Sequence, residues 1–140
     1  MKSLLIQEPR DLISISIHNI LSYRKDEEFY NLVKDWNKTL ILNITDLYPV
    51  TVIFEGEHIN FEPGETKKAD LKVSMKIETM IDVAYGRLNP IWAVMTRKIK
   101  IKGIFKVGVL LKFMNIFLKS MKMVAEEPNI NYYELEKETT

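Results

Sequence analysis

Residues 98–124 read KIKIKGIFKVGVLLKFMNIFLKSMKMV, and the change of pattern inside this stretch decides the fold. Up to Lys102, lysine and isoleucine alternate strictly, which predicts a strand with one wet face and one buried face. After Gly103, apolar residues recur at helical spacing from Phe105 to Val124. A one-faced strand followed by an apolar helix predicts a sheet that helices cover on one side only.

The helix predicted from Phe105 to Val124 is more apolar than packing on one sheet requires. Its polar side is narrow and consists of Lys112, Asn115, Lys119 and Lys122. At about 100° per residue the remaining apolar surface spans roughly 200°, about twice the stripe with which a surface helix meets a core. Another helix of the same chain, a second subunit or a hydrophobic ligand could cover the surplus, and the pattern leaves these alternatives open.

The rest of the chain supplies four more strands. Alternation or short apolar runs bounded by turns predict them at residues 39–45, 50–54, 59–61 and 71–75. The first three are joined by short connections, which favours an antiparallel meander. We therefore predict an α+β fold of two layers, in which a five-stranded, mostly antiparallel sheet is covered on one face by helices.

Helical spacing predicts three further helical segments. Residues 8–36 are expected to be helical, with Pro9 in the first turn and Asp26 as an N-cap within the segment, although residues 13–17 alternate as a strand would. Residues 77–88 form the second, with Gly86 as its stop. Asn89-Pro90 then offers an N-cap and a first-turn proline for a third, which runs to Met95.

Length and composition narrow the classes of function. The 140 residues fit one domain, 1–140, with a polar tail from 126 to 140, and the net charge of +1 removes the electrostatic reason to propose a nucleic-acid partner. The absence of cysteine excludes disulfides, thiolate catalysis and cysteine zinc sites. No apolar run approaches the ~20 residues of a membrane span, and none fits a secretory signal. We expect a soluble, cytoplasmic protein.

Chemistry that would mark an enzyme or a metal centre is sparse. His58 lies in a predicted turn beside Glu55 and Glu57, a trio that could bind a metal, but a solvated turn is the preferred interpretation. Asp70 and Asp82 are isolated carboxylates rather than a catalytic pair. We predict no catalytic residues, no metal and no cofactor.

A row of basic residues is predicted on the outer face of the sheet. It consists of Lys72, Lys76, Lys98, Lys100 and Lys102. A solvated face that resists aggregation is the simpler interpretation. The functional alternative is contact of this row with a phosphate-bearing head group or with an anionic membrane, the latter transiently through Lys98, Lys100 and Lys102.

Three motifs, taken in order, resemble one known family. They are Ala69-Asp70-Leu71-Lys72-Val73-Ser74, Tyr85-Gly86-Arg87-Leu88-Asn89-Pro90 and Lys98-Ile99-Lys100-Ile101-Lys102-Gly103. In this order and spacing, over about residues 30–120, the chain resembles the sterol carrier protein family, also called non-specific lipid-transfer proteins. The family often has a glycine just before its basic strand, where this chain has Arg97.

The resemblance implies an apolar tunnel between sheet and helices that binds a sterol, a fatty acid or a fatty-acyl-CoA without catalysis. Carried over residue by residue, it implies the tunnel lining Phe54, Met80, Ala84, Leu88, Trp92, Met95, Phe105, Val109, Leu110, Phe113, Met114 and Phe117.

Carriage of a hydrophobic ligand is therefore the leading hypothesis for function. One alternative is a structural module that dimerises through its apolar C-terminal helix, so the protein could be a monomer or a homodimer. Another is a non-catalytic accessory that binds an acyl group for a partner enzyme.

Overall fold

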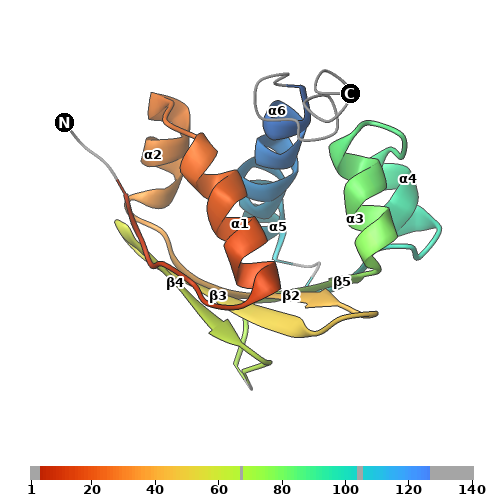
Figure 1. Ribbon diagram of the computed structural model, residues 1–140, viewed down its shortest axis with the longest axis horizontal. Coiled ribbons are helices and arrows are strands. Elements are labelled where there is room, and N and C mark those ends of the chain that lie inside the picture. Colours follow the sequence, from red (N-terminus) through yellow and green to blue (C-terminus); the bar gives the residue numbers. More distant parts are fainter. Residues whose placement is uncertain (1–3, 67, 104–105, 127–140) are drawn as a thin grey trace, which may run out of the picture.

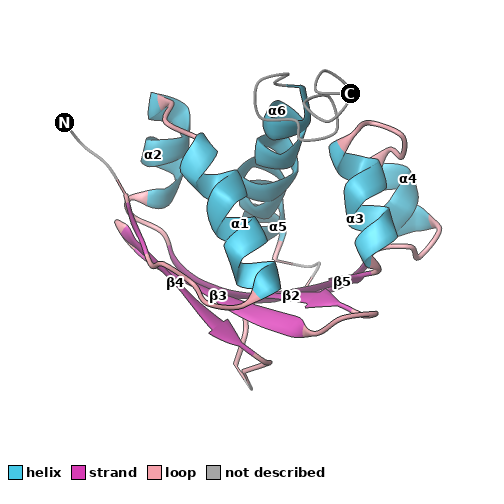
Figure 2. Cartoon of the chain, viewed as in Figure 1, coloured by secondary structure: helices cyan, strands magenta, loops and turns pink. Residues whose placement is uncertain are grey.

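A computed structural model describes residues 4–66, 68–103 and 106–126, in which the helices all lie on one side of a sheet (Figure 1). Figure 2 shows the two layers edge-on, with the strands below and the helices above. The α+β, two-layer architecture predicted from the sequence is confirmed. Phe105 and the tail beyond residue 126 lie outside the described residues.

The sheet contains six described strands in the order β1-β4-β3-β2-β5-β6. Pairing is antiparallel for β2–β3, β3–β4 and β5–β6, and parallel for β1–β4 and β2–β5. The strands are β1 (Leu5–Ile6), β2 (Asn37–Ile44), β3 (Pro49–Glu55), β4 (His58–Pro63), β5 (Leu71–Met75) and β6 (Lys100–Lys102).

The strand β1 is the one that the sequence pattern did not predict, so the sheet has six strands rather than five. It is two residues long and pairs with the edge of β4, where the Leu5 amide donates to the Glu57 carbonyl at 2.6 Å. The Gln7 side chain then accepts from the Phe61 amide at 2.7 Å. Such an edge pairing depends on where the N-terminus lies in the fold, and two residues carry no periodicity that could reveal it.

The helices begin largely where their caps predict. They are α1 (Leu12–Tyr23), α2 (Glu27–Val33), α3 (Ile77–Ala84), α4 (Pro90–Met95), α5 (Val107–Phe113), the π-helix η1 (Met114–Lys119) and α6 (Ser120–Glu126). Asn89 caps α4, with Pro90 in the first turn, and Gly86 has a φ of 75°, as a left-handed stop requires.

The N-terminal helical segment differs from the prediction in two ways. It consists of two helices instead of one, because Arg24 and Asp26 have extended backbone angles between them. Asp26 caps α2, as predicted, by accepting from the Phe29 amide at 3.0 Å. The first helix, however, starts at Leu12 with Asp11 as its cap, so Pro9 precedes the helix and the prediction for Pro9 was wrong.

The segments α5, η1 and α6 follow one another without a break, and we call them together the C-terminal helix. Its central turns are π-helical, so the spacing of 100° per residue does not hold through residues 114–119. The polar side of this helix, which the sequence predicted to face solvent, is therefore only partly exposed. Lys112 donates to the Leu32 carbonyl at 3.1 Å, and Asn115 is also half-buried, whereas Lys119 and Lys122 are exposed.

The outer face of the sheet is also less wet than predicted. Because β5 pairs beside β2 rather than β4, the chain after β4 has to cross one face of the sheet to reach it. Thr51 on β3 donates to the Gly64 carbonyl at 2.9 Å and accepts from the Thr66 amide at 3.3 Å, which places this crossing on the outer face. Ile41 and Thr51 are consequently 3% and 2% exposed although they point away from the helices.

The core lies between the sheet and the helices and includes the C-terminal helix. The ring of Phe54 on β3 lies 4.9 Å from that of Trp36 and 6.2 Å from that of Phe117. Each such buried aromatic contributes several kcal/mol to stability through the area that it removes from water. Within the described ranges, no helix combines the length and the apolar character that crossing a bilayer demands.

Candidate functional site

An apolar cavity of about 200 Å³ lies between α4, the C-terminal helix and the end of the sheet. We call it the open cavity. Each of its lining side chains is apolar, and the set is Met75, Pro90, Ile91, Val94, Met95, Ile99, Ile101, Leu110, Phe113, Met114 and Leu118. An apolar cavity of ~150 Å³ can bind benzene. The open cavity is larger than that, so it can hold part of a hydrophobic ligand.

A second, much smaller apolar space lies deeper, between α1 and the C-terminal helix. This inner cavity has a volume of about 20 Å³ and is lined by Ile13, Ser16, Ile17, Ile20, Leu42, Ile44, Met75, Met80, Phe113, Phe117, Leu118 and Met121. Met75, Phe113 and Leu118 line both cavities. These three side chains are therefore the partition between the two spaces.

Large apolar side chains are exposed at the rim of the open cavity. On α4, Ile91, Trp92 and Met95 are 60%, 58% and 70% exposed. Val107 and Leu111 of the C-terminal helix are exposed as well, but neither of them lines the open cavity. Part of the surplus apolar surface of that helix is thus covered by α1 and α3 of the same chain, and part of it lines the open cavity or faces outward.

The residues proposed from the family resemblance lie in several places. Met95, Leu110, Phe113 and Met114 line the open cavity, and Met80, Phe113 and Phe117 line the inner one. The others lie elsewhere, with Phe54 and Val109 buried in the core, Ala84 half-buried against it, Trp92 on the exposed rim, and Leu88 beside a polar pocket. Phe105 lies outside the described residues.

Sequence reasoning missed the contributions of α1 and of the strand ends. Ile13, Ile17 and Ile20 reach the inner cavity from α1, and Ile99 and Ile101 reach the open cavity from beside and within β6. The isoleucines at 99 and 101 were recognised as the buried side of a strand, which is the signal that could have found them. The α1 residues needed the position of that helix over the sheet.

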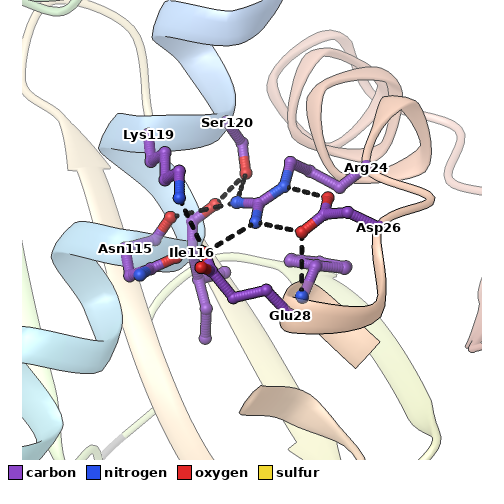
Figure 3. Close-up of polar contacts among 8 residues, drawn as sticks. Arg24, Asp26, Glu28, Asn115, Ile116, Lys119 and Ser120 are labelled. Atoms are coloured by element: carbon purple, nitrogen blue, oxygen red, sulfur yellow. Dashed lines mark hydrogen bonds and ion pairs between the residues drawn. The ribbon is translucent and has the colours of Figure 1, made fainter. Parts of the chain in front are cut away.

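A cluster of polar contacts anchors the middle of the C-terminal helix to the segment between α1 and α2, as Figure 3 shows. The buried guanidinium of Arg24 forms two hydrogen bonds with Asp26, Nε to Oδ1 at 2.7 Å and Nη2 to Oδ2 at 2.8 Å. Its Nη1 donates to Ser120 Oγ at 3.2 Å and to the Asn115 carbonyl at 3.3 Å. Arg24 thereby joins the α1–α2 corner to η1 and α6.

Electrostatics strengthen this anchor. Hydrogen bonds from Arg24 lower the pKa of Asp26 to about 2, so the pair is ionised throughout the physiological range. Glu28 accepts from Lys119 at 2.7 Å, and this contact lowers the pKa of Glu28. The guanidinium of Arg24 also lies 4.9 Å from the centre of the Phe29 ring. Because the guanidinium of Arg24 is planar and bonds to all of these partners, it is well suited to hold the α1–α2 corner and the C-terminal helix in a fixed arrangement.

Glu55, Glu57 and His58 in the β3–β4 turn, which the sequence offered as a possible metal site, do not converge on one point. The Glu57 carboxylate accepts a hydrogen bond from the Tyr30 hydroxyl at 2.9 Å. Glu55 and His58 are exposed, and across the described parts of the chain no three histidine or acidic side chains gather as metal ligands would.

The fold has counterparts among solved structures. The sterol carrier protein domain 2 of Helicoverpa armigera is 19% identical, with a TM-score of 0.58 over 91% of this chain and 99% of that one. A crystal structure of sterol carrier protein 2 is 16% identical, with a TM-score of 0.55 over 76% of this chain and 94% of that one. At these identities the likeness establishes the fold alone.

Part of a larger enzyme is similar as well. The inverting sec-alkylsulfatase Pisa1 from Pseudomonas sp. is 20% identical with a TM-score of 0.51, but the match covers 63% of this chain and spans 13% of the length of that enzyme. None of the curated proteins compared with the sequence matches it significantly.

The sequence itself matches a family model. The model describes the SCP-2 sterol transfer family, and the match extends over residues 17–118, from the middle of α1 through most of the C-terminal helix. This range includes most of the lining of the open and inner cavities. The chain therefore belongs to the SCP-2 sterol transfer family.

Proposed function

We propose that the protein binds and carries a ligand with a long apolar chain, such as a fatty acid, a fatty-acyl group or another lipid, and does not transform it. The observation that carries this proposal is the open cavity, whose lining side chains are apolar without exception. Apolar cavities with flexible walls suit flexible chains, and Met75, Met95 and Met114 contribute unbranched, polarizable side chains. Membership of a sterol transfer family agrees with this function.

The size of the cavity indicates how a whole ligand would fit. A volume of about 200 Å³ is below the roughly 300–1,000 Å³ usual for drug-sized ligands. A change of rotamer at Phe113 or Leu118 would join the open cavity to the inner one, because both side chains line both spaces. We therefore expect a long chain to enter at α4 and to displace these two side chains as it reaches α1.

The decisive experiment fills the cavity from one position of the C-terminal helix. Met114→Trp adds bulk inside the open cavity, while Leu111→Trp adds the same side chain one turn earlier at a site that is 60% exposed. Affinity for a fluorescent long-chain fatty acid should fall about ten-fold or more in the first variant and stay unchanged in the second. Native mass spectrometry of the purified protein should show a co-purified lipid. Equal binding by both variants, or no binding by the wild type, contradicts the proposal.

We further propose that the rim of the open cavity contacts an anionic membrane transiently, in the cytoplasm, while the ligand is exchanged. Ile91, Trp92 and Met95 present an exposed apolar surface, and Lys98, Lys100 and Lys102 are exposed nearby in the chain. An apolar group with tryptophan, flanked by cations, suits the interface of a bilayer that bears negative charge.

A role beside an acyl-processing enzyme is the second candidate. It is supported by the partial likeness to an alkylsulfatase, an enzyme of which a small part resembles this chain.

A dimer formed through the C-terminal helix is the remaining alternative, and the exposed side chains of Val107 and Leu111 favour it. Analytical ultracentrifugation with and without bound fatty acid tests the dimer, because a carrier, or an accessory without its enzyme, remains monomeric in both states.

A further inference from the structure

A polar pocket lies directly beside the apolar cavities, and the carriage of an apolar chain proposed above does not use it. It has a volume of about 440 Å³ and lies between the end of β5, the start of α3 and the segment that leads into β6. Four cationic side chains line it, namely Lys76, Arg97, Lys98 and Lys100. We call it the basic pocket.

The four cations of the basic pocket have no ion-pair partners among the described residues. None of its four cations forms an ion pair or a side-chain hydrogen bond with another described residue, whereas Lys72, Lys106 and Lys119 each pair with a carboxylate. Two acidic residues, Glu78 and Asp82, also line the pocket, and Arg87 pairs with Asp82 at 2.9 Å. Four cations therefore face one carboxylate that has no other partner among the described residues.

The backbone at Arg97 holds one of these cations in a strained conformation. Its φ of 62° makes it the only described residue other than glycine with a positive φ. Arg97 N–H donates to the Val94 carbonyl at 3.1 Å, so the residue reverses the chain just after α4. A left-handed residue at this place is ordinarily glycine, and such strain is typical of functional positions. Hydroxyl groups of Thr45, Ser74 and Thr79 supply further donors to the same pocket.

One side chain, that of Met75, separates the basic pocket from the two apolar cavities. Met75, the last residue of β5, lines the basic pocket, the open cavity and the inner cavity. A ligand whose chain lies against Met75 in the open cavity can bring its polar end to the basic pocket by displacing this one side chain.

We propose that the basic pocket binds a phosphate group at the polar end of a ligand whose apolar chain lies in the open cavity. A phosphate carries close to two negative charges and three acceptor oxygens, which matches several cations and hydroxyls better than a single carboxylate does. This inference rests on the proposed carriage of an apolar chain and specifies the class of ligand as an amphiphile with a phosphate group.

The test compares two ligands with the same chain, dodecyl phosphate and dodecanol, both as monomers and without vesicles. At low salt the wild type should bind dodecyl phosphate about ten-fold or more tightly than dodecanol, since each partly exposed ion pair contributes a modest amount and several act together. In the double variant Arg97→Gly, Lys76→Gln this preference should disappear while the affinity for dodecanol stays the same. Glycine also relieves the strain at position 97, so this change does not threaten the fold.

Lys102→Gln is the matched control for the single variant Lys76→Gln, which should lose part of the preference, because each removes one positive charge and Lys102 does not line the basic pocket. Lys102→Gln should keep the full preference for dodecyl phosphate. Equal loss in the control overturns the proposal, since it would reflect net charge instead of the pocket. Equal binding of both ligands by the wild type also overturns it while leaving the carriage of a chain intact, whereas binding of neither refutes the proposed function itself.

A last arm separates the sources of phosphate. Inorganic phosphate should compete with dodecyl phosphate only weakly, because it lacks the chain that the open cavity holds. If inorganic phosphate competes with dodecyl phosphate at equal concentration, the pocket binds free phosphate, and the proposal that it binds an amphiphile is overturned. Binding of dodecyl phosphate without vesicles, by the wild type and by Lys102→Gln alike, separates the pocket from membrane contact through the exposed lysines.

Discussion

The two ends of the helical layer are built in opposite ways. Where α1 and α2 meet the C-terminal helix, the Arg24 cluster joins the helices, and Phe117 and Ile116 are buried beneath it. At the other end, α4 stands over a cavity, with Trp92 and Met95 exposed. At the first end, which we call the closed end, the charges of Arg24, Asp26 and Glu28 are paired within the chain. At the second, the open end, the cations of the basic pocket have no partner among the described residues.

This difference indicates how a small protein can hold a ligand without losing its fold. A firmly anchored closed end fixes one wall of the cavity, so the open end can remain incompletely packed and still be positioned. Stability and binding should accordingly respond to different residues, and matched substitutions at the two ends can test this.

The largest contrast is expected from truncating one aromatic residue at each end. Phe117→Ala at the closed end removes a buried ring that contacts Phe54 and should lower the free energy of unfolding by about 3–5 kcal/mol. Trp92→Ala at the open end, already 58% exposed, should change it by no more than about 0.5 kcal/mol. Urea denaturation of both variants gives the comparison, and similar losses would mean that the two ends are packed alike.

A matched pair of arginine substitutions comes next. Arg24→Ala removes a buried guanidinium with several partners and should destabilise the protein by about 3 kcal/mol. Arg97→Gly relieves a positive φ and should leave stability unchanged or raise it by up to about 1 kcal/mol. Thermal unfolding followed by circular dichroism measures both. A large loss in Arg97→Gly would show that this side chain is structural.

Acid should weaken the closed end specifically. The pKa of Asp26 is lowered from 3.8 to about 2 in the folded protein, mainly by the hydrogen bonds from Arg24. Its stabilising contribution is therefore fully present above about pH 4 and is lost as the pH falls towards 2, to the extent of roughly 1 kcal/mol once solvent screening of this partly exposed carboxylate is allowed for. Asp26→Asn should remove that part of the pH dependence. Identical acid profiles for the variant and the wild type would contradict it.

The smallest effects concern membrane contact at the open end. Lys102→Gln should weaken co-sedimentation with anionic vesicles by about five-fold at low salt and much less at high salt, because the one charge that it removes near the surface contributes roughly 1 kcal/mol. Lys119→Gln, an equally large charge change at the exposed edge of the closed end, is the control and should bind vesicles almost normally. Parallel losses in both variants would remove any special role of the open end.

Much of the fold was predictable because its signals are local. Strict alternation predicted β5 and the strand at residue 101, and Asp26, Gly86 and Asn89 marked helix ends through their own chemistry. The strand β1 was missed because its pairing with β4 arises only after the sheet has formed.

The site was less predictable than the fold. Helical periodicity showed that the C-terminal helix has too much apolar surface, but it could not tell which part α1 covers and which part lines a cavity. Trp92 was assigned to the lining on resemblance, and the structure places it on the rim. The role of Arg24 could not be predicted, because a single arginine between two helices forms no sequence pattern. Its role depends on contacts with residues about ninety positions away in the chain.

The parallel pairing of β2 with β5 has a consequence for how the protein folds. The strands β2, β3 and β4 pair with their neighbours in the chain, whereas Leu40 and Leu71 come together only after the intervening segment has crossed the outer face. Closing that long loop is entropically unfavourable, so we expect the three-stranded meander to gain hydrogen-exchange protection first and β5 to dock later. Met75 and most residues that line the open cavity come after β4 in the chain, so we expect the ligand to bind only once this later part has docked on the meander.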